Sequence, residues 1–182
     1  MKVNRAVIAA IVVLVLIAAG WWLFGRRGMA ESVDLLALYP AAKKQPAESV
    51  LQVEDATLNG ETKRAIVSNG ASRITWRVRI PDDAWLRVDV GMKPEVWEAQ
   101  GEGAYFFVLV SDGRSSEQLF SQHVHPYANT ADRKWMPAFV DLSAYAGEEM
   151  ELIFNVRAGA GGTSTNYANV VALWGAPAIV IR

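Results

Sequence analysis

Alternation of apolar and polar side chains is the feature that most restricts how this chain can fold. Apolar residues fall at every second position in residues 74–80, where Thr75, Arg77 and Arg79 separate them, and again in residues 86–90 and 150–156. Successive side chains of a β-strand point to opposite faces, so a period of two predicts strands with one buried face. The chain is therefore expected to form β-structure with a core on one side of each strand.

Further strands follow from short apolar runs between turn residues. The run YFFVLV at residues 105–110 is apolar at every position, which predicts a central strand covered on both faces, with a turn at 112–114. Other strands are expected at residues 50–54, 64–68, 117–123, 136–140, 167–172 and 178–181. Eight to ten short strands without a long helix in this region predict an all-β sandwich or barrel over residues 49–182.

The N-terminal region has a different character. Residues 6–24 are 19 residues without a charged side chain, enough to span roughly 28 Å as a helix at about 1.5 Å per residue. Trp21 and Trp22 stand near the end of this run, where indole rings favour the membrane–water interface. Cations flank the run on both sides, at Lys2, Arg5, Arg26 and Arg27. Residues 1–27 are thus predicted to be a transmembrane anchor that contacts lipid through 6–24.

Two questions about this anchor stay open in the sequence. Ala18-Ala19-Gly20 would suit a signal-peptide cleavage site, but the apolar run continues past it to a basic stop, which favours a retained anchor. Lys43 and Lys44 slightly favour a cytoplasmic C-terminal side, whereas a basic tail before an apolar run is typical of exported proteins. The expectation is a single-pass protein of the bacterial inner (cytoplasmic) membrane, with a cytoplasmic N-terminus and a periplasmic C-terminal domain.

Residues 28–48 are expected to link the anchor to the sandwich. Ser32 could cap a short helix that Pro40 ends, with Leu35 and Leu36 on its apolar face. Such a helix needs a surface to pack on, either its own domain or a membrane or neighbouring subunit. Residues 43–46 follow as a polar hinge.

Charge and composition exclude several functions. The chain of 182 residues has 18 Lys plus Arg and 19 Asp plus Glu, and residues 28–182 hold 14 of these cations and all 19 acids, a formal charge of −5. This balance argues against a nucleic-acid partner, which requires clustered excess cations. The absence of Cys excludes disulfides, thiolate zinc sites, iron–sulfur clusters and a cysteine nucleophile.

Catalytic and metal-binding patterns are weak. Only His123 and His125 could serve as a histidine base, and no nucleophile elbow, phosphate-binding glycine loop or zinc-protease helix accompanies them. The same two residues could hold a metal with Asp132 or Glu117, but a third ligand is not identifiable. The chain is therefore predicted to be non-catalytic, with no metal and no cofactor.

Aromatic residues in predicted loops are the stronger candidates for binding. Trp97 lies in a polar, glycine-flanked loop and is either a lid over its own sandwich or an exposed anchor for a partner. Tyr127 and Trp135 flank the loop at 126–134 and could stack on a sugar or a protein. The remaining tryptophans of this region, Trp76, Trp85 and Trp174, are expected in the core.

The C-terminal half resembles a galactose-binding-like jelly roll, the sandwich of many carbohydrate-binding modules. The resemblance rests on the order of residues 106–114 (FFVLVSDGR), 119–126 (LFSQHVHP), 139–156 (FVDLSAYAGEEMELIFNV) and 172–180 (ALWGAPAIV). It implies a jelly-roll fold with glycan as a further partner. It departs from the related modules at Val170, where they often carry Asp, and in loop 158–165, which has no carboxylate for calcium.

Two functions are consistent with these patterns. The favoured one is a non-catalytic accessory subunit of a larger membrane complex, for example respiratory or photosynthetic, whose partners are integral membrane subunits. Its interaction residues would be Trp21, Trp22, Leu35, Leu36, Trp97, Tyr127 and Trp135. The alternative is a membrane-anchored envelope carbohydrate-binding module; an envelope hydrolase lacks a nucleophile–base pair.

Overall fold

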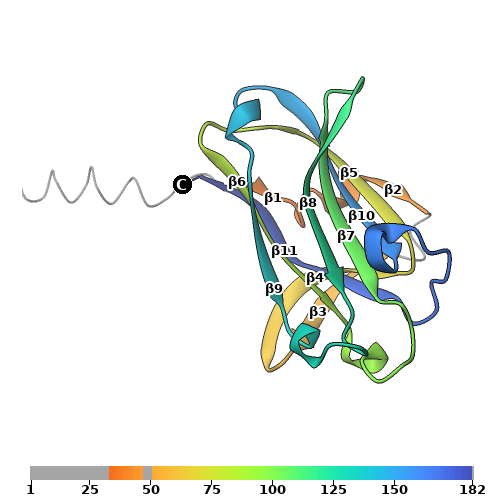
Figure 1. Cartoon of the computed structure of the whole chain (residues 1–182). Helices are drawn as coiled ribbons and strands as arrows, with labels where there is room; N and C mark the ends of the chain where they lie inside the picture. Colours follow the sequence, from red (N-terminus) through yellow and green to blue (C-terminus); the bar gives the residue numbers. More distant parts are fainter. Residues whose placement is uncertain (1–32, 47–50, 182) are drawn as a thin grey trace, which may run out of the picture. The chain divides into compact units, whose positions relative to one another are not determined.

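The computed structural model describes residues 33–46 and 51–181 of the chain (Figure 1). The predicted span 6–24, with Trp21 and Trp22 and the alternative cleavage site, lies outside these residues. Within the described ranges, no helix is long and apolar enough to cross a membrane. The described residues belong to one compact unit, Ser32–Arg182.

Two antiparallel sheets pack face to face as a β-sandwich, one of the two architectures that the pattern of short strands predicted. The first sheet has the order β3-β4-β11-β6-β9, with β1 also pairing with β11, and the second has the order β2-β5-β10-β7-β8. The strands are β1 (Val33–Asp34), β2 (Lys43–Gln45), β3 (Leu51–Leu58), β4 (Glu61–Asn69), β5 (Ser72–Arg79), β6 (Ala84–Met92), β7 (Ala104–Ser111), β8 (Ser116–Val124), β9 (Met136–Asp141), β10 (Glu149–Ala158) and β11 (Val171–Ile181). Short 3-10 helices occur at η1 (Tyr39–Ala41), η3 (Pro94–Val96), η4 (Thr130–Asp132), η5 (Ser143–Tyr145) and η6 (Ala160–Gly162).

Aromatic rings join the two sheets at the centre of the core. Trp174 of β11 is fully buried and contacts Phe154 of β10 at 4.4 Å and Phe106 of β7 at 4.9 Å between ring centroids. Trp76 of β5 packs on the same Phe154, at 4.9 Å. Trp76 and Trp174 therefore fill the core as expected, whereas Trp85 is only half-buried.

Residues 139–156, one of the four stretches that carry the jelly-roll resemblance, form a strand, a short helix, a glycine turn and the next strand. Strand β9 ends at Asp141, η5 follows, and Gly147 takes a φ of +79° before β10 begins. Hydrogen bonds from Ser143 hold the pKa of the Asp141 carboxyl below its ordinary value. The turn is thus stabilised by an acid that accepts from the backbone two residues ahead, a common turn device.

The expected linker helix was wrong. Residues 33–45 instead add β1 to the first sheet, where Val33 pairs with Ile179, and β2 to the second, where Gln45 pairs with Arg73. Leu35 is fully buried, and its carbonyl accepts a hydrogen bond from the Trp76 indole at 3.1 Å. Pairing with strands of both sheets gives the backbone N–H and C=O groups of this segment hydrogen-bond partners, whereas a short isolated helix is only marginally stable. The sandwich therefore begins before residue 49.

Two strand predictions also need correction. Residues 167–170 lie in a loop, and one strand, β11, runs through both predicted C-terminal strands with an irregularity between Gly175 and Ala178. Strand β7 is covered only in part on its outer face, where Gly162 of η6 packs on Phe107. Its outward side chains Tyr105, Phe107 and Leu109 are half-buried, because they lie on the outer face of the second sheet.

The core packing makes a direct prediction. Truncating Trp174 to Ala removes both ring contacts between the sheets and should lower the free energy of unfolding by about 3–5 kcal/mol. The measurement is urea denaturation of the full-length chain in mild detergent, followed by circular dichroism. Phe139→Ala serves as the control, since Phe139 is 51% exposed and should cost less than about 1 kcal/mol. Equal losses in the two variants would contradict this account of the core.

Candidate functional site

One end of the sandwich gathers most of the residues that the sequence marked for function. The loops that contain η3 and η4 lie together at this end (Figure 1), and β8 brings His123 and the following His125 to it. Arg133 ties the two loops together. Its guanidinium bonds Glu98 at 2.6 Å, the Trp97 carbonyl at 3.3 Å and the Pro126 carbonyl at 3.0 Å.

Trp135 is buried rather than exposed. Only 5% of it is accessible, and its indole donates a hydrogen bond to the Glu61 carbonyl at 2.9 Å. The ring lies against the outer face of the first sheet, where a Cβ added at Gly175 would come within 2.8 Å of it. The expectation that Trp135 could stack on a ligand is wrong, because its own sheet already occupies the ring.

Trp97 acts as a lid over the same sheet. Its indole donates to the Met92 carbonyl at 2.8 Å, and the half-buried ring packs on the apolar cluster that includes Trp135 and Leu173. Lys93 fixes the start of this loop through Glu54. The hydrogen bond to Glu54 raises the pKa of Lys93 despite the desolvation that opposes it. Of the two interpretations of Trp97, the structure therefore favours the lid.

The two histidines bind the backbone of the η3 loop. His123 Nε2 lies 2.9 Å from the Glu102 carbonyl and His125 Nε2 lies 2.8 Å from the Gly101 carbonyl, so each ring can donate there. Asp132 accepts from the backbone N–H of His125 instead of joining its ring. Glu117, the other suggested metal ligand, accepts from the Tyr145 hydroxyl.

A metal site is not assembled from these groups. No cluster of three or more potential ligands occurs in the part of the chain that the structure describes. The histidines instead position the loop, and their rings line up with neighbouring aromatic side chains.

These rings form an aromatic row that runs from the loop end onto the outer face of the second sheet. The aromatic row consists of Tyr127, His125, His123, Tyr105 and Phe107. Successive ring centroids lie 6.4, 5.5, 5.9 and 4.6 Å apart. The first tyrosine is 46% exposed, and the two rings of β7 are half-buried. The row presents aromatic surface that the protein's own core does not use.

Polar side chains continue the same face beside the row. Asn155 of β10 pairs in register with Arg73 of β5 on one side and with Phe107 of β7 on the other. Arg157 lies two residues further along β10, with its guanidinium 5.8 Å from the Phe107 ring centroid. A pocket of about 280 Å³ opens here, lined among others by both arginines, Asn155 and Tyr167. We call the aromatic row and these polar side chains together the binding face.

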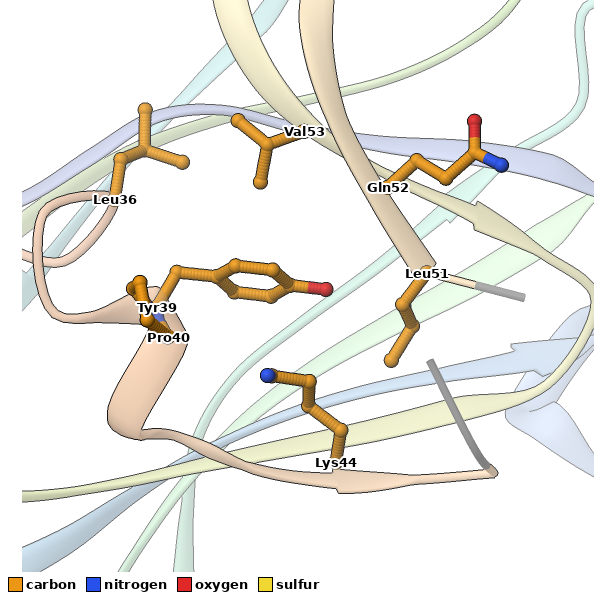
Figure 2. A pocket seen from close by; sticks show the side chains of 7 residues that line it. All are labelled: Leu36, Tyr39, Pro40, Lys44, Leu51, Gln52 and Val53. Carbon is orange, nitrogen blue, oxygen red and sulfur yellow. The ribbon is translucent and has the colours of Figure 1, made fainter. Parts of the chain in front are cut away.

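A larger pocket, of about 590 Å³, lies between η1, β2 and β3 (Figure 2). Figure 2 shows Tyr39 and Lys44 reaching into the same space, and the Lys44 ammonium lies 4.6 Å from the tyrosine ring centroid. The predicted interaction residue Leu36 lines it, with Pro40, Leu51, Gln52 and Val53. Because Lys44 covers one face of the phenol, this pocket offers less free aromatic surface than the binding face.

Sequence reasoning missed most of the binding face. It identified Tyr127 and both histidines, but not Tyr105, Phe107 or the two arginines. The available signal was the YFFVLV run, in which large rings stand at outward positions of a strand. Apolar residues on both faces were interpreted as burial on both faces, although an uncovered sheet surface explains them equally.

The fold is that of carbohydrate-binding modules. The CBM51 domain of Clostridium perfringens GH95, solved in complex with methyl-galactose, aligns with a TM-score of 0.57 and 19% identity, over 82% of this chain and 99% of that one. The structure of the CBM51-2 and INT domains of C. perfringens ZmpB aligns with a TM-score of 0.52 and 19% identity, over 77% of this chain and 28% of that one. The predicted galactose-binding-like jelly roll is thereby confirmed.

Sequence comparison adds one relative. A segment of 103 residues, 56% of this chain, is 34% identical to an uncharacterized protein of Archaeoglobus fulgidus. The match spans only 24% of that protein, so the matched segment corresponds to about a quarter of its length. No protein-family model matches the chain.

The buried position of Trp135 can be tested through Gly175. A Gly175→Ala substitution places a methyl group against a rigid indole and should lower the free energy of unfolding by about 1–3 kcal/mol. In a Trp135→Leu background the same substitution should cost clearly less, because the clashing ring is gone. Urea denaturation of the four proteins in this double-mutant cycle measures the difference. Additive costs would show that the indole does not lie on Gly175.

Proposed function

We propose that this chain is a non-catalytic, membrane-tethered glycan-binding module that uses the binding face of its second sheet. The supporting observation is the aromatic row beside Asn155 and two arginines on the outer face of the second sheet. The apolar faces of sugar rings stack on aromatic side chains, while amides and guanidinium groups bond their hydroxyls. A binding role needs no nucleophile and base, which agrees with the sequence patterns.

The fold supports this proposal but does not fix the ligand. One structural neighbour was solved with methyl-galactose, and its identity to this chain is 19%. Val170, which replaces the frequent Asp of related modules, is 3% exposed in the main core and cannot contact a ligand. Glycan recognition would therefore rest on the binding face and not on that position.

The accessory-subunit hypothesis has less support. Leu35, Trp97 and Trp135 were among its predicted interaction residues, but these side chains pack within their own domain. Leu35 and Trp135 are fully or almost fully buried. Leu36 and Tyr127 retain accessible surface, which a glycan module can equally use. No described residue favours an integral membrane partner, so glycan binding becomes the leading function.

For the location, we propose that residues 6–24 tether the module to a membrane with the sandwich on the extracytoplasmic side. The length of the apolar run, its basic flanks and the interfacial tryptophans support this. A tethered module would hold envelope glycan at a high effective concentration near the membrane.

The binding face predicts how single substitutions affect glycan binding. Tyr105→Ala and Tyr127→Ala should each weaken binding of the tightest glycan found on a glycan microarray about fivefold, since stacking is worth about 1 kcal/mol beyond buried area. Calorimetric titration of the full-length chain in mild detergent measures the change.

Phe139→Ala is the matched control, because Phe139 is exposed on the outer face of the first sheet and should leave affinity unchanged. Full binding by both tyrosine variants would exclude this face, and an array without any bound glycan would refute the proposed function.

The proposed orientation predicts protease sensitivity. In intact spheroplasts that express the chain with a C-terminal epitope, added protease should remove the epitope, because the sandwich lies outside the cytoplasm. A cytoplasmic protein in the same cells should survive as a control. Protection of the epitope until the membrane is lysed would reverse the orientation.

A further inference from the structure

Two arginines of the binding face share one pocket. Arg73 of β5 and Arg157 of β10 both line the pocket of about 280 Å³, with Asn155 between them on the strand pair and Tyr167 on the loop after η6. This volume is close to the lower end of ligand pockets, about 300 Å³, and suits one sugar ring. The pocket therefore adds a cationic end to the aromatic row.

Strand register makes the two arginines diagonal neighbours on the outer face of the second sheet. Arg73 pairs directly with Asn155, and Arg157 stands two residues further on the same face of β10. Diagonal neighbours on adjacent antiparallel strands are about 7–8 Å apart, a distance that two arginine side chains can bridge toward one ligand. The Arg157 guanidinium also lies 5.8 Å from the centroid of the Phe107 ring, on the β7 side of β10, so Arg157 connects the pocket with the aromatic row.

Neither arginine has an acidic partner within the described residues. Arg77, four residues along β5 from Arg73, contrasts with this because its guanidinium bonds Glu149 at 2.6 Å. Residues 28–182 carry a formal charge of −5, so acidic groups are abundant in the domain. One pocket of this acidic domain therefore holds two guanidinium groups without an acidic partner among the described residues. Such groups can bind an anionic group of a ligand.

From this arrangement we propose that the binding face recognises glycans whose sugars carry an oxyanion group, either a uronic acid carboxylate or a sulfate ester. The inference rests on the proposed function and specifies its ligand class. Arg73 and Arg157 bond the oxyanion through their planar forks, which match carboxylate and sulfate geometry. Asn155 bonds a ring hydroxyl, and Tyr167, 37% exposed, offers a stacking surface.

The test compares charged and neutral polymers. Binding of the full-length chain in mild non-ionic detergent is measured to polygalacturonate against galactan, and to dextran sulfate against dextran. We expect at least tenfold tighter binding to one acidic polymer than to its neutral counterpart. Preference for polygalacturonate identifies a carboxylate ligand, and preference for dextran sulfate identifies a sulfate ester.

Substitutions then assign the preference to the pocket. Arg73→Gln and Arg157→Gln should each weaken binding of the preferred acidic polymer about tenfold, as expected for lost hydrogen bonds to a charged group. Arg77→Gln is the matched control, since it removes the same charge from the same strand and should leave binding unchanged. Circular dichroism verifies that each variant is folded.

Several outcomes would overturn the inference. Equal affinity for acidic and neutral glycans through the aromatic row would refute the anionic ligand while the proposed function stands. Equal losses in the Arg77→Gln and Arg73→Gln variants, or equal competition by a single-stranded oligonucleotide, would show a general charge effect without a site. Failure to bind any glycan on the polymers or the microarray would refute the proposed function as well.

Discussion

The packing of Trp174 against Phe106 and Phe154 is the contact on which the sandwich depends. These rings come from β11 of the first sheet and from β7 and β10 of the second, so they hold together strands that are distant in the sequence. The three residues are fully buried, and burial of large aromatic surface is the main source of stability for a domain without disulfides. Their positions also fix which side chains of β7 and β10 must point outward.

The outer faces of the two sheets differ in how far their apolar side chains are buried. On the first sheet, Trp135 and Trp97 fold back over the strands and bury a second apolar cluster with Leu58 and Leu173. On the second sheet, Tyr105 and the neighbouring rings remain half-buried. The loops that contain η3 and η4 therefore pack Trp97 and Trp135 against the first sheet, whereas the outward rings of β7 on the second sheet are covered only in part.

The sequence predicted the architecture well and the site only in part. Alternation at residues 74–80 and 150–156 indicated strands correctly, because a half-buried strand imposes a period of two regardless of its neighbours. The helix expected near Leu35 failed because the segment instead pairs with β11 as β1 and buries Leu35 in the core. Tyr127 was identified from its loop position, whereas Arg73 and Arg157 gave no local signal, since their proximity depends on strand register.

The sequence by itself determined three properties of the protein. These are an apolar N-terminal run with basic ends, an acidic region with the alternation of β-strands, and too few reactive side chains for the usual catalytic constellations. Composition and periodicity can be read from the sequence because they do not depend on how distant segments pack. Only the tertiary structure decided that Trp135 is buried against the outer face of the first sheet, that the histidines hold a loop, and that Arg73, Asn155 and Phe107 form one surface. Those outcomes depend on which strands pair and in what register. Pairing and register are set by how both sheets pack together around one core, so no short segment of the sequence determines them.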